Sequence, residues 1–134
     1  MTITLPKLLL AGMSEGLSMA FASTCTESGY DVVGFARSSR TDSETSGTVT
    51  RAGVAYEHVI CNLGNPDVVA EQWGLIVDDA SVAIFNAHQL LIVPLAKTKP
   101  KKYLQVWQIC VSVLTLWHTP FCLHGRSAVR AISL

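Results

Sequence analysis

Hydrophobic positions along the chain gather into short runs that alternate with amphipathic stretches. Five apolar runs of strand length occupy residues 7–11, 31–36, 55–61, 81–86 and 128–133. Helical spacing of apolar residues predicts three helices, at residues 16–28, 66–75 and 100–118. Pro66 and Pro100 suit the first turns of the second and third helices. Because strands alternate with helices, the sequence predicts an α/β fold whose parallel strands are joined by right-handed crossovers.

The first strand-to-helix junction has the pattern of a phosphate-binding turn. Gly12 follows the first apolar run, and Gly16 directly precedes the first predicted helix. A helix N-terminus attracts anions through its N–H groups and its dipole, and glycine lets a phosphate approach the backbone closely. The G-x-x-x-G spacing alone occurs by chance, but its place between a strand and a helix favours a dinucleotide site. The alternative is a tight turn that binds nothing.

This junction resembles the opening motif of the short-chain dehydrogenase/reductase family, T-G-x-x-x-G-x-G. Here the motif is Ala11-Gly12-Met13-Ser14-Glu15-Gly16-Leu17-Ser18. Two of the three glycines are kept, and Ser18 stands at the third, where it suits close packing of helix on strand less well. The resemblance implies four cofactor-contacting residues, which are Gly12, Ser14, Gly16 and Leu17.

Two later segments are similar to family landmarks in the family's order. The segment Cys61-Asn62-Leu63-Gly64-Asn65-Pro66-Asp67 is similar to the D-L-x-D-P segment after the third strand, with Asn62 in place of the Asp that meets the adenine. The segment Val82-Ala-Ile-Phe85-Asn86-Ala87-His88 is similar to the N-N-A-G segment after the fourth strand, where Asn86 and Ala87 match directly and His88 replaces the glycine. The resemblance implies further cofactor contacts from Asn62, Leu63, Asn86 and Ala87.

The catalytic residues of the family have no counterpart in this sequence. The family uses a Ser followed by Tyr-x-x-x-Lys, whereas the residues four positions after the three tyrosines are Gly34, Ile60 and Trp107. Cys110 stands where the family often has an active-site Asn. The resemblance therefore implies a Rossmann-like doubly wound parallel sheet, truncated to about five strands and three helices. We expect residues 1–134 to form a single, incomplete cofactor-binding domain of an oxidoreductase that is inactive alone.

The residues after the second predicted strand bear on the choice of cofactor. An acidic residue there would bind the ribose of NAD, and an arginine suits the 2′-phosphate of NADP. Ala36 replaces the acid, and Arg37 and Arg40 follow it, which favours NADP. Glu15 favours NAD, since NADP users of the family often carry a basic residue at that place. The alternative for Arg37 is an ordinary exposed charge.

Composition and charge exclude some other classes of function. The chain is 49% hydrophobic with a net charge of zero, which suits one small globular domain. Four scattered cysteines indicate free thiols in a reducing cytoplasm, and no spacing of histidines and cysteines suggests a zinc site. The lysines of segment 97–102 have no aromatic residues between them, so we expect a solvated loop and no nucleic-acid partner.

The third predicted helix is apolar around most of its circumference. Residues 103–123 contain no Asp, Glu, Lys or Arg and are long enough to span a bilayer, although polar residues interrupt them. We therefore expect helix 103–118 to form an interface in a homo-oligomer or with a related partner. Three hypotheses remain open: a cofactor-binding part of an oxidoreductase, a catalytically silent nucleotide- or partner-binding protein, and a small membrane-associated protein.

Overall fold

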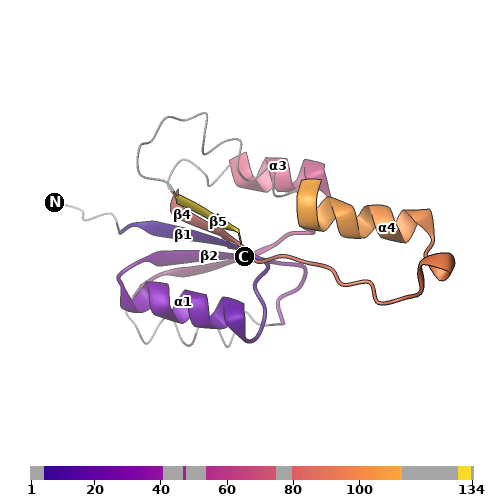
Figure 1. Ribbon diagram of the computed structural model, residues 1–134. Coiled ribbons are helices and arrows are strands. Elements are labelled where there is room, and N and C mark those ends of the chain that lie inside the picture. Colours follow the sequence, from indigo (N-terminus) through magenta and orange to yellow (C-terminus); the bar gives the residue numbers. More distant parts are fainter. Residues whose placement is uncertain (1–4, 41–46, 48–53, 75–79, 113–129, 134) are drawn as a thin grey trace.

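Five parallel strands form one sheet in the order β3-β2-β1-β4-β5 (Figure 1). The computed structural model describes residues 5–40, 47, 54–74, 80–112 and 130–133. The strands are β1 (Lys7–Ala11), β2 (Asp31–Ala36), β3 (Tyr56–Ile60), β4 (Ala80–Phe85) and β5 (Arg130–Ser133). The chain builds outward from β1 to β3 and then crosses back to place β4 on the other side of β1. Open α/β sheets bind ligands at the carboxyl edge beside such a reversal.

Helices cover both faces of this sheet. Helix α1 (Leu17–Glu27) lies on one face and α3 (Pro66–Gly74) on the other (Figure 1). Helix α4 (Pro100–Trp107) follows a short 3-10 turn, η2 (Leu95–Lys97), and continues into a π-helical turn, η3 (Gln108–Ser112).

The central strand β1 is buried on both faces. Leu8 and Leu10 pack with Ala22 of α1, whereas Leu9 packs with Val69 of α3. All three leucines are 0% exposed. A strand covered on both faces is a continuous apolar run and not an alternating one, which is why this strand is evident in the sequence.

The predicted α/β fold and its element order are confirmed. The observed strands β1 and β2 have the predicted ends, and β3, β4 and β5 differ by one or two residues at their ends. The third helix differs, because its α-helical part ends at Trp107 and a π-helical turn follows. Residues 113–118 of that predicted helix lie outside the described residues. The expectation of a single domain over residues 1–134 stays a prediction.

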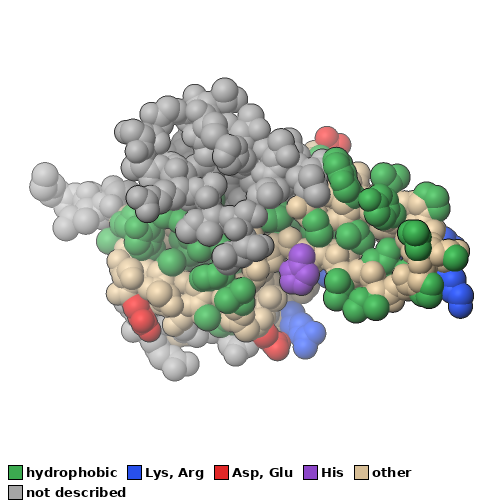
Figure 2. Space-filling view, viewed as in Figure 1, with side chains coloured by type: hydrophobic (Ala, Val, Ile, Leu, Met, Phe, Trp, Pro, Cys, Tyr) green, Lys and Arg blue, Asp and Glu red, His purple; other side chains and the backbone are tan. Residues whose placement is uncertain are grey.

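Large apolar side chains are exposed on α4 and on the segment before it. Among them are Leu90, Ile92, Leu95, Tyr103, Leu104 and Trp107, with exposed fractions from 48% to 86%. Figure 2 shows hydrophobic side chains over the end of the molecule that α4 forms. Within the part of the chain that the structure describes, no helix is long and apolar enough to cross a membrane. Residues 113–123 of the membrane candidate lie outside that part.

Candidate functional site

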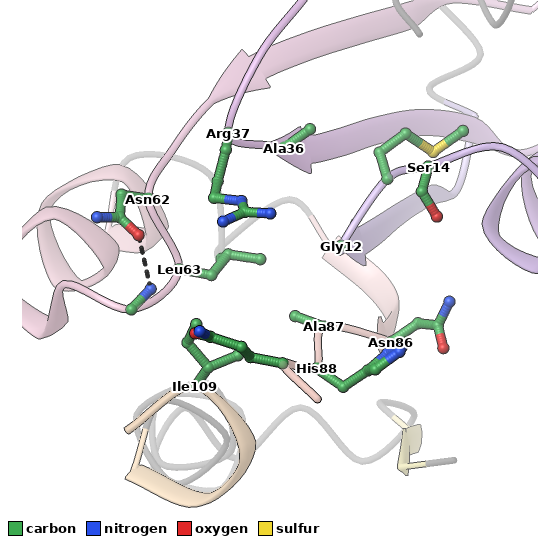
Figure 3. A pocket seen from close by; sticks show the side chains of 13 residues that line it. Gly12, Ser14, Ala36, Arg37, Asn62, Leu63, Asn86, Ala87, His88 and Ile109 are labelled. Atoms are coloured by element: carbon green, nitrogen blue, oxygen red, sulfur yellow. Dashed lines mark hydrogen bonds between the residues drawn. The ribbon is translucent and has the colours of Figure 1, made fainter. Parts of the chain in front are cut away.

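A cavity of about 230 Å³ lies where β1, β2 and β4 end (Figure 3). The turn after β1, the end of β2, the loops after β3 and β4, and the π-helical turn all contribute to its walls. Seven of the nine predicted cofactor residues line it, namely Gly12, Ser14, Arg37, Asn62, Leu63, Asn86 and Ala87. The structure therefore brings together residues that lie up to 75 positions apart in the sequence.

The remaining predicted residues lie outside this cavity wall. Gly16 and Leu17 stand at the start of α1, where Gly16 is the N-cap and Leu17 is 56% exposed. Cys110 is partly buried, and its thiol donates a long hydrogen bond of 4.0 Å to the carbonyl oxygen of Gln89. Cys110 therefore bonds to the chain after β4 and does not line the cavity. The functional roles assigned to all of these residues stay predictions.

Gly12 is required by the packing of the protein itself. Its φ of +87° is a conformation that favours glycine, and a β-carbon there would lie 2.7 Å from the backbone nitrogen of Ala87. The N–H groups of Gly12 and Met13 both donate to the carbonyl oxygen of Phe35, at 3.0 and 2.8 Å. The turn after β1 is thus held against the ends of β2 and β4. Gly12 was expected to make room for a phosphate, and the structure adds this second reason.

Gly16 differs from Gly12 in what surrounds it. Its φ is +90°, but no atom lies within 4 Å of the position that a β-carbon would take. Gly16 begins α1 without any side chain that could cap the helix. A side chain at this residue would therefore occupy open space beside the positive end of the helix.

Ser18 joins three segments of the site through one hydroxyl group. The side chain is 0% exposed, and its Oγ donates to the carbonyl oxygen of Gly12 at 2.6 Å. The same oxygen accepts a hydrogen bond of 2.8 Å from Nδ2 of Asn86. The hydroxyl thus connects α1, the turn after β1 and the segment after β4. In the sequence, Ser18 is recognisable only as an imperfect replacement for a glycine, and this bridge is not evident.

Asn86 is held in place by the bridge. Its backbone N–H donates to the carbonyl oxygen of Ala11 at 2.9 Å, which continues the pairing of β4 with β1. Its side-chain amide turns away from the cavity toward α1 (Figure 3). Asn86 therefore shapes the cavity wall chiefly through its fixed position, and its amide is already engaged within the protein.

Arg37 provides the positive charge of the cavity. Its guanidinium extends from the end of β2 toward Leu63 (Figure 3). The residues that line the cavity include no Asp or Glu, so the local charge favours an anionic ligand. Arg40 forms an ion pair of 3.8 Å with Glu15, and both side chains are more than half exposed, so this pair contributes little stability.

The loop after β3 closes the side of the cavity opposite Gly12. The Oδ1 atom of Asn62 accepts a hydrogen bond of 3.1 Å from the backbone N–H of Gly64, which tightens the loop (dashed line in Figure 3). A β-carbon on Gly64 would lie 3.1 Å from Cγ1 of Ile109, so the π-helical turn approaches this loop closely. Ile109 was missed in the sequence, because nothing local there indicates a π-helical turn.

Five other cavity residues were not predicted, namely Met13, Ala36, Gly64, His88 and Gln89. Four of them lie within or directly beside the segments that carry the family resemblance, and Ala36 is the last residue of β2. The carboxyl ends of parallel strands share one edge of a sheet, so the chain just after each strand is where cavity residues could have been sought.

The described cysteines are free thiols without metal-binding neighbours. Burial raises the pKa of the Cys61 thiol and of the Cys25 thiol, so both stay protonated at neutral pH and are poor nucleophiles. Cys110 is also free, and Cys122 lies outside the described residues. Among the residues that the structure describes, no group of three or more His, Cys, Asp or Glu is placed to hold a metal ion.

Comparison with known proteins finds matches among solved structures. No protein-family model matches the sequence, and no curated protein matches it either. A metagenomic short-chain oxidoreductase in complex with NADP has a TM-score of 0.86 and 20% identity, over 96% of this chain and 61% of that one. The chain has the short-chain dehydrogenase/reductase fold. A short-chain dehydrogenase/reductase double mutant from Serratia marcescens has a TM-score of 0.85 and 15% identity, over 96% of this chain and 54% of that one.

The match to the short-chain dehydrogenase/reductase fold covers part of the matched proteins. A short-chain dehydrogenase from Sphingobium yanoikuyae in complex with NADPH has a TM-score of 0.83 and 19% identity, over 95% of this chain and 53% of that one. The chain thus spans between about half and three fifths of the length of these proteins, in their N-terminal portion. The resemblance inferred from the sequence is confirmed at the level of the fold.

The Ser18 bridge yields a stability prediction. Ser18→Ala removes the buried oxygen that serves both Gly12 and Asn86, and each of those polar groups then loses a partner. We expect the free energy of unfolding to fall by about 1–3 kcal/mol, measured by urea denaturation. The control is Ser28→Ala, which removes an exposed hydroxyl bonded to the Thr24 carbonyl oxygen at 3.0 Å. Equal losses in the two variants would contradict a special role for the bridge.

Proposed function

We propose that this chain binds a nicotinamide dinucleotide, and that it prefers NADP to NAD. The observation that carries the proposal is the convergence of seven residues, selected from the sequence as cofactor contacts, on one cavity at the carboxyl edge of the sheet. Two of the matched structures contain NADP or NADPH, and a matched xylitol dehydrogenase contains NAD⁺. The cofactor would supply a hydride, and the chain would supply binding and orientation.

The features of the site suit the parts of a dinucleotide. The open side of Gly16 at the positive end of α1 suits the pyrophosphate, because a helix N-terminus favours anions. Ser14 lines the same end of the cavity and offers a hydroxyl donor. Asn62 and Leu63 form the wall that suits the adenine, and Arg37 lies beside them to meet the 2′-phosphate.

We propose that the chain alone does not reduce carbonyl compounds. The sequence has no Tyr-x-x-x-Lys pair, and the Cys110 thiol donates a long hydrogen bond to the carbonyl oxygen of Gln89. Loss of a positioned proton donor costs about 100- to 10,000-fold in rate. Sustained oxidation of NADPH by the purified chain, with a panel of carbonyl compounds, would contradict this proposal.

A cytoplasmic location fits the chemistry of the thiols. Cys25, Cys61 and Cys110 are free, and thiols in this state are typical of a reducing compartment. We therefore propose that the chain functions in the cytoplasm.

The cofactor proposal is tested at Gly16. Gly16→Val places a branched side chain in the open space at the start of α1, and we expect NADPH binding to be lost in calorimetry. The matched control is Gly29→Val, because Gly29 also has a positive φ, +82°, and also has no atom within 4 Å of its β-carbon position. Both variants place a side chain at a positive φ and should lose stability, but only Gly16→Val should lose binding. Equal affinity for NADPH in Gly16→Val and the unmodified chain would refute the proposed site.

The preference for NADP is tested at Arg37. Arg37→Ala should weaken NADPH binding about tenfold, which corresponds to about 1.4 kcal/mol for one charge-assisted hydrogen bond at an exposed site. NADH binding should change little, since NADH lacks the 2′-phosphate. Arg40→Ala is the control, because the Arg40 guanidinium already pairs with Glu15. If both cofactors weaken equally, or if neither does, Arg37 is a solvated surface charge.

Partner binding through α4 is a second candidate role. Leu104 and Trp107 of this helix are 57% and 48% exposed, and exposed large apolar groups mark association surfaces. We propose that a second copy of the chain covers them. Light scattering should then detect a dimer or a larger species at micromolar concentration, and Leu104→Lys should shift it to the monomer. Leu17→Lys, at a 56% exposed leucine of α1, should not. A monodisperse monomer of the unmodified chain would contradict the proposal.

A further inference from the structure

We propose that Tyr56 and His58 of β3 position the segment Arg37–Arg40 and thereby set the preference between NADP and NAD. This inference rests on the proposed dinucleotide function and adds two positioning residues to it. Neither side chain lines the cavity of about 230 Å³ at the ends of β1, β2 and β4, and neither has a role in the site described above.

Tyr56 and His58 form a directional chain of hydrogen bonds that ends on the segment after β2. The Nε2 atom of His58 lies 2.8 Å from the carbonyl oxygen of Ser38, and its Nδ1 atom lies 2.7 Å from the hydroxyl oxygen of Tyr56. A carbonyl oxygen can only accept, so Nε2 carries a proton. In neutral His58 the Nδ1 atom then accepts, and the Tyr56 hydroxyl donates to it. The Ser38 carbonyl oxygen therefore selects this tautomer of His58, and the Tyr56 hydroxyl stabilises it by donating to Nδ1.

Tyr56 is partly buried beside the core, and its ring supports this chain of hydrogen bonds. A β-carbon on Gly34 would lie 2.6 Å from the Tyr56 hydroxyl oxygen, so the glycine in the middle of β2 makes room for the ring. Tyr56 also packs against the buried cluster that contains Met13 and Ala36, both of which line the cavity. The two hydrogen bonds thus connect a packed part of the sheet to an exposed stretch of chain.

The stretch held in this way is the one that carries the cationic side chains. Arg37, Ser38 and Arg40 are exposed, and together with Ser14 and Glu15 they line a second cavity of about 360 Å³. The ion pair between Arg40 and Glu15 holds the stretch weakly, because both of its side chains are in solvent. The hydrogen bond from His58 to Ser38 is also exposed, but it holds the backbone of the stretch one residue after Arg37, and so it limits where the Arg37 side chain begins.

The position of the Arg37 guanidinium should affect the affinity for NADPH but not the affinity for NADH. NADPH carries a 2′-phosphate, whose recognition is strengthened when its cationic partner is already in place. NADH has no such group, so its binding does not depend on the position of Arg37. Loss of the His58 bond should therefore reduce affinity for NADPH selectively.

The experiment compares two substitutions of His58. His58→Phe keeps a flat ring and removes both nitrogen atoms, and we expect NADPH binding to weaken about three- to tenfold with NADH binding unchanged. His58→Gln keeps a donor that can reach the Ser38 carbonyl and should restore most of the affinity. Tyr56→Phe, which removes only the hydroxyl, should give a smaller selective loss. Equal weakening of both cofactors in His58→Phe would overturn the inference in favour of a general structural role.

A double variant tests whether His58 acts through Arg37. In an Arg37→Ala background, His58→Phe should cause no further loss of NADPH affinity, because the group that it positions is gone. A further loss as large as the one in the unmodified background would overturn the inference, since His58 would then act by another route.

Limited trypsin digestion tests the positioning without any cofactor. Trypsin cleaves after Arg37 and Arg40, and cleavage there should be several-fold faster in His58→Phe than in the unmodified chain or in His58→Gln, as mapped by mass spectrometry. An unchanged cleavage rate would overturn the positioning role whatever the cofactors do. If the unmodified chain binds neither cofactor, the proposed function and the cofactor preference fail together, and the digestion alone decides whether His58 holds the segment.

Discussion

The geometry of the carboxyl edge depends on one buried hydroxyl group, that of Ser18. It donates to the Gly12 carbonyl oxygen and accepts from the Asn86 amide, so a single oxygen fixes the spacing of β1, β4 and α1. Gly12 sets a limit from the other side, since a β-carbon there would overlap the backbone of Ala87. A buried polar group that loses its partner costs about 1–3 kcal/mol, so these three segments cannot shift independently. The Ser18 hydroxyl thus holds together two walls of the cavity, the turn after β1 and the segment after β4.

The parts of the fold that were evident in the sequence are those buried on two sides. The leucines of β1 form a continuous apolar run, and every position of β2 from Val32 to Ala36 is buried. Strand β3 lies at the sheet edge, and its five residues are only half-buried or exposed, so its pattern is weaker. Helix α4 was the least predictable element, because nothing in the sequence marks the residue at which it changes into a π-helical turn.

Some residues of the candidate site could likewise be predicted from the sequence, and others could not. Residues directly after parallel strands could be found from the sequence, because the strands deliver their carboxyl ends to one edge. Ser18 and Asn86 are 68 positions apart, and nothing in either local sequence predicts that their side chains meet. His58 likewise looks like an ordinary residue of an edge strand, and its link to Ser38 depends on the register that pairs it with Gly34. Contacts between side chains on different elements are therefore what sequence patterns leave undetermined.

Helix α4 contributes a positive charge near Arg37 in addition to its position beside the cavity. Residues 1–96 hold all ten acidic side chains and four basic ones, a charge of −6, whereas residues 97–134 hold six basic side chains and no acid. Lys102 and Arg37, one from each region, line a third cavity of about 320 Å³ together with Gln105 and Gln108. No acidic residue lines that cavity. Residues 97–134 thus contribute one cationic side chain to this cavity, that of Lys102, and residues 1–96 contribute one, that of Arg37.

The proposed cofactor binding and the proton transfer of the resembled family rest on different residues. The turn after β1 and Arg37 lie at the sheet edge, the Ser18 bridge ties that turn and the segment after β4 to α1, and all of these residues are among the described ones. Proton transfer in the resembled family needs the Tyr-x-x-x-Lys pair, which this sequence lacks, and Cys110 is a weak hydrogen-bonding group that bonds to Gln89. The proposed site would orient a dinucleotide without offering a proton to a substrate. The contacts that hold its walls, namely the Ser18 bridge and the hydrogen bonds of the turn after β1, are contacts of the sheet edge itself.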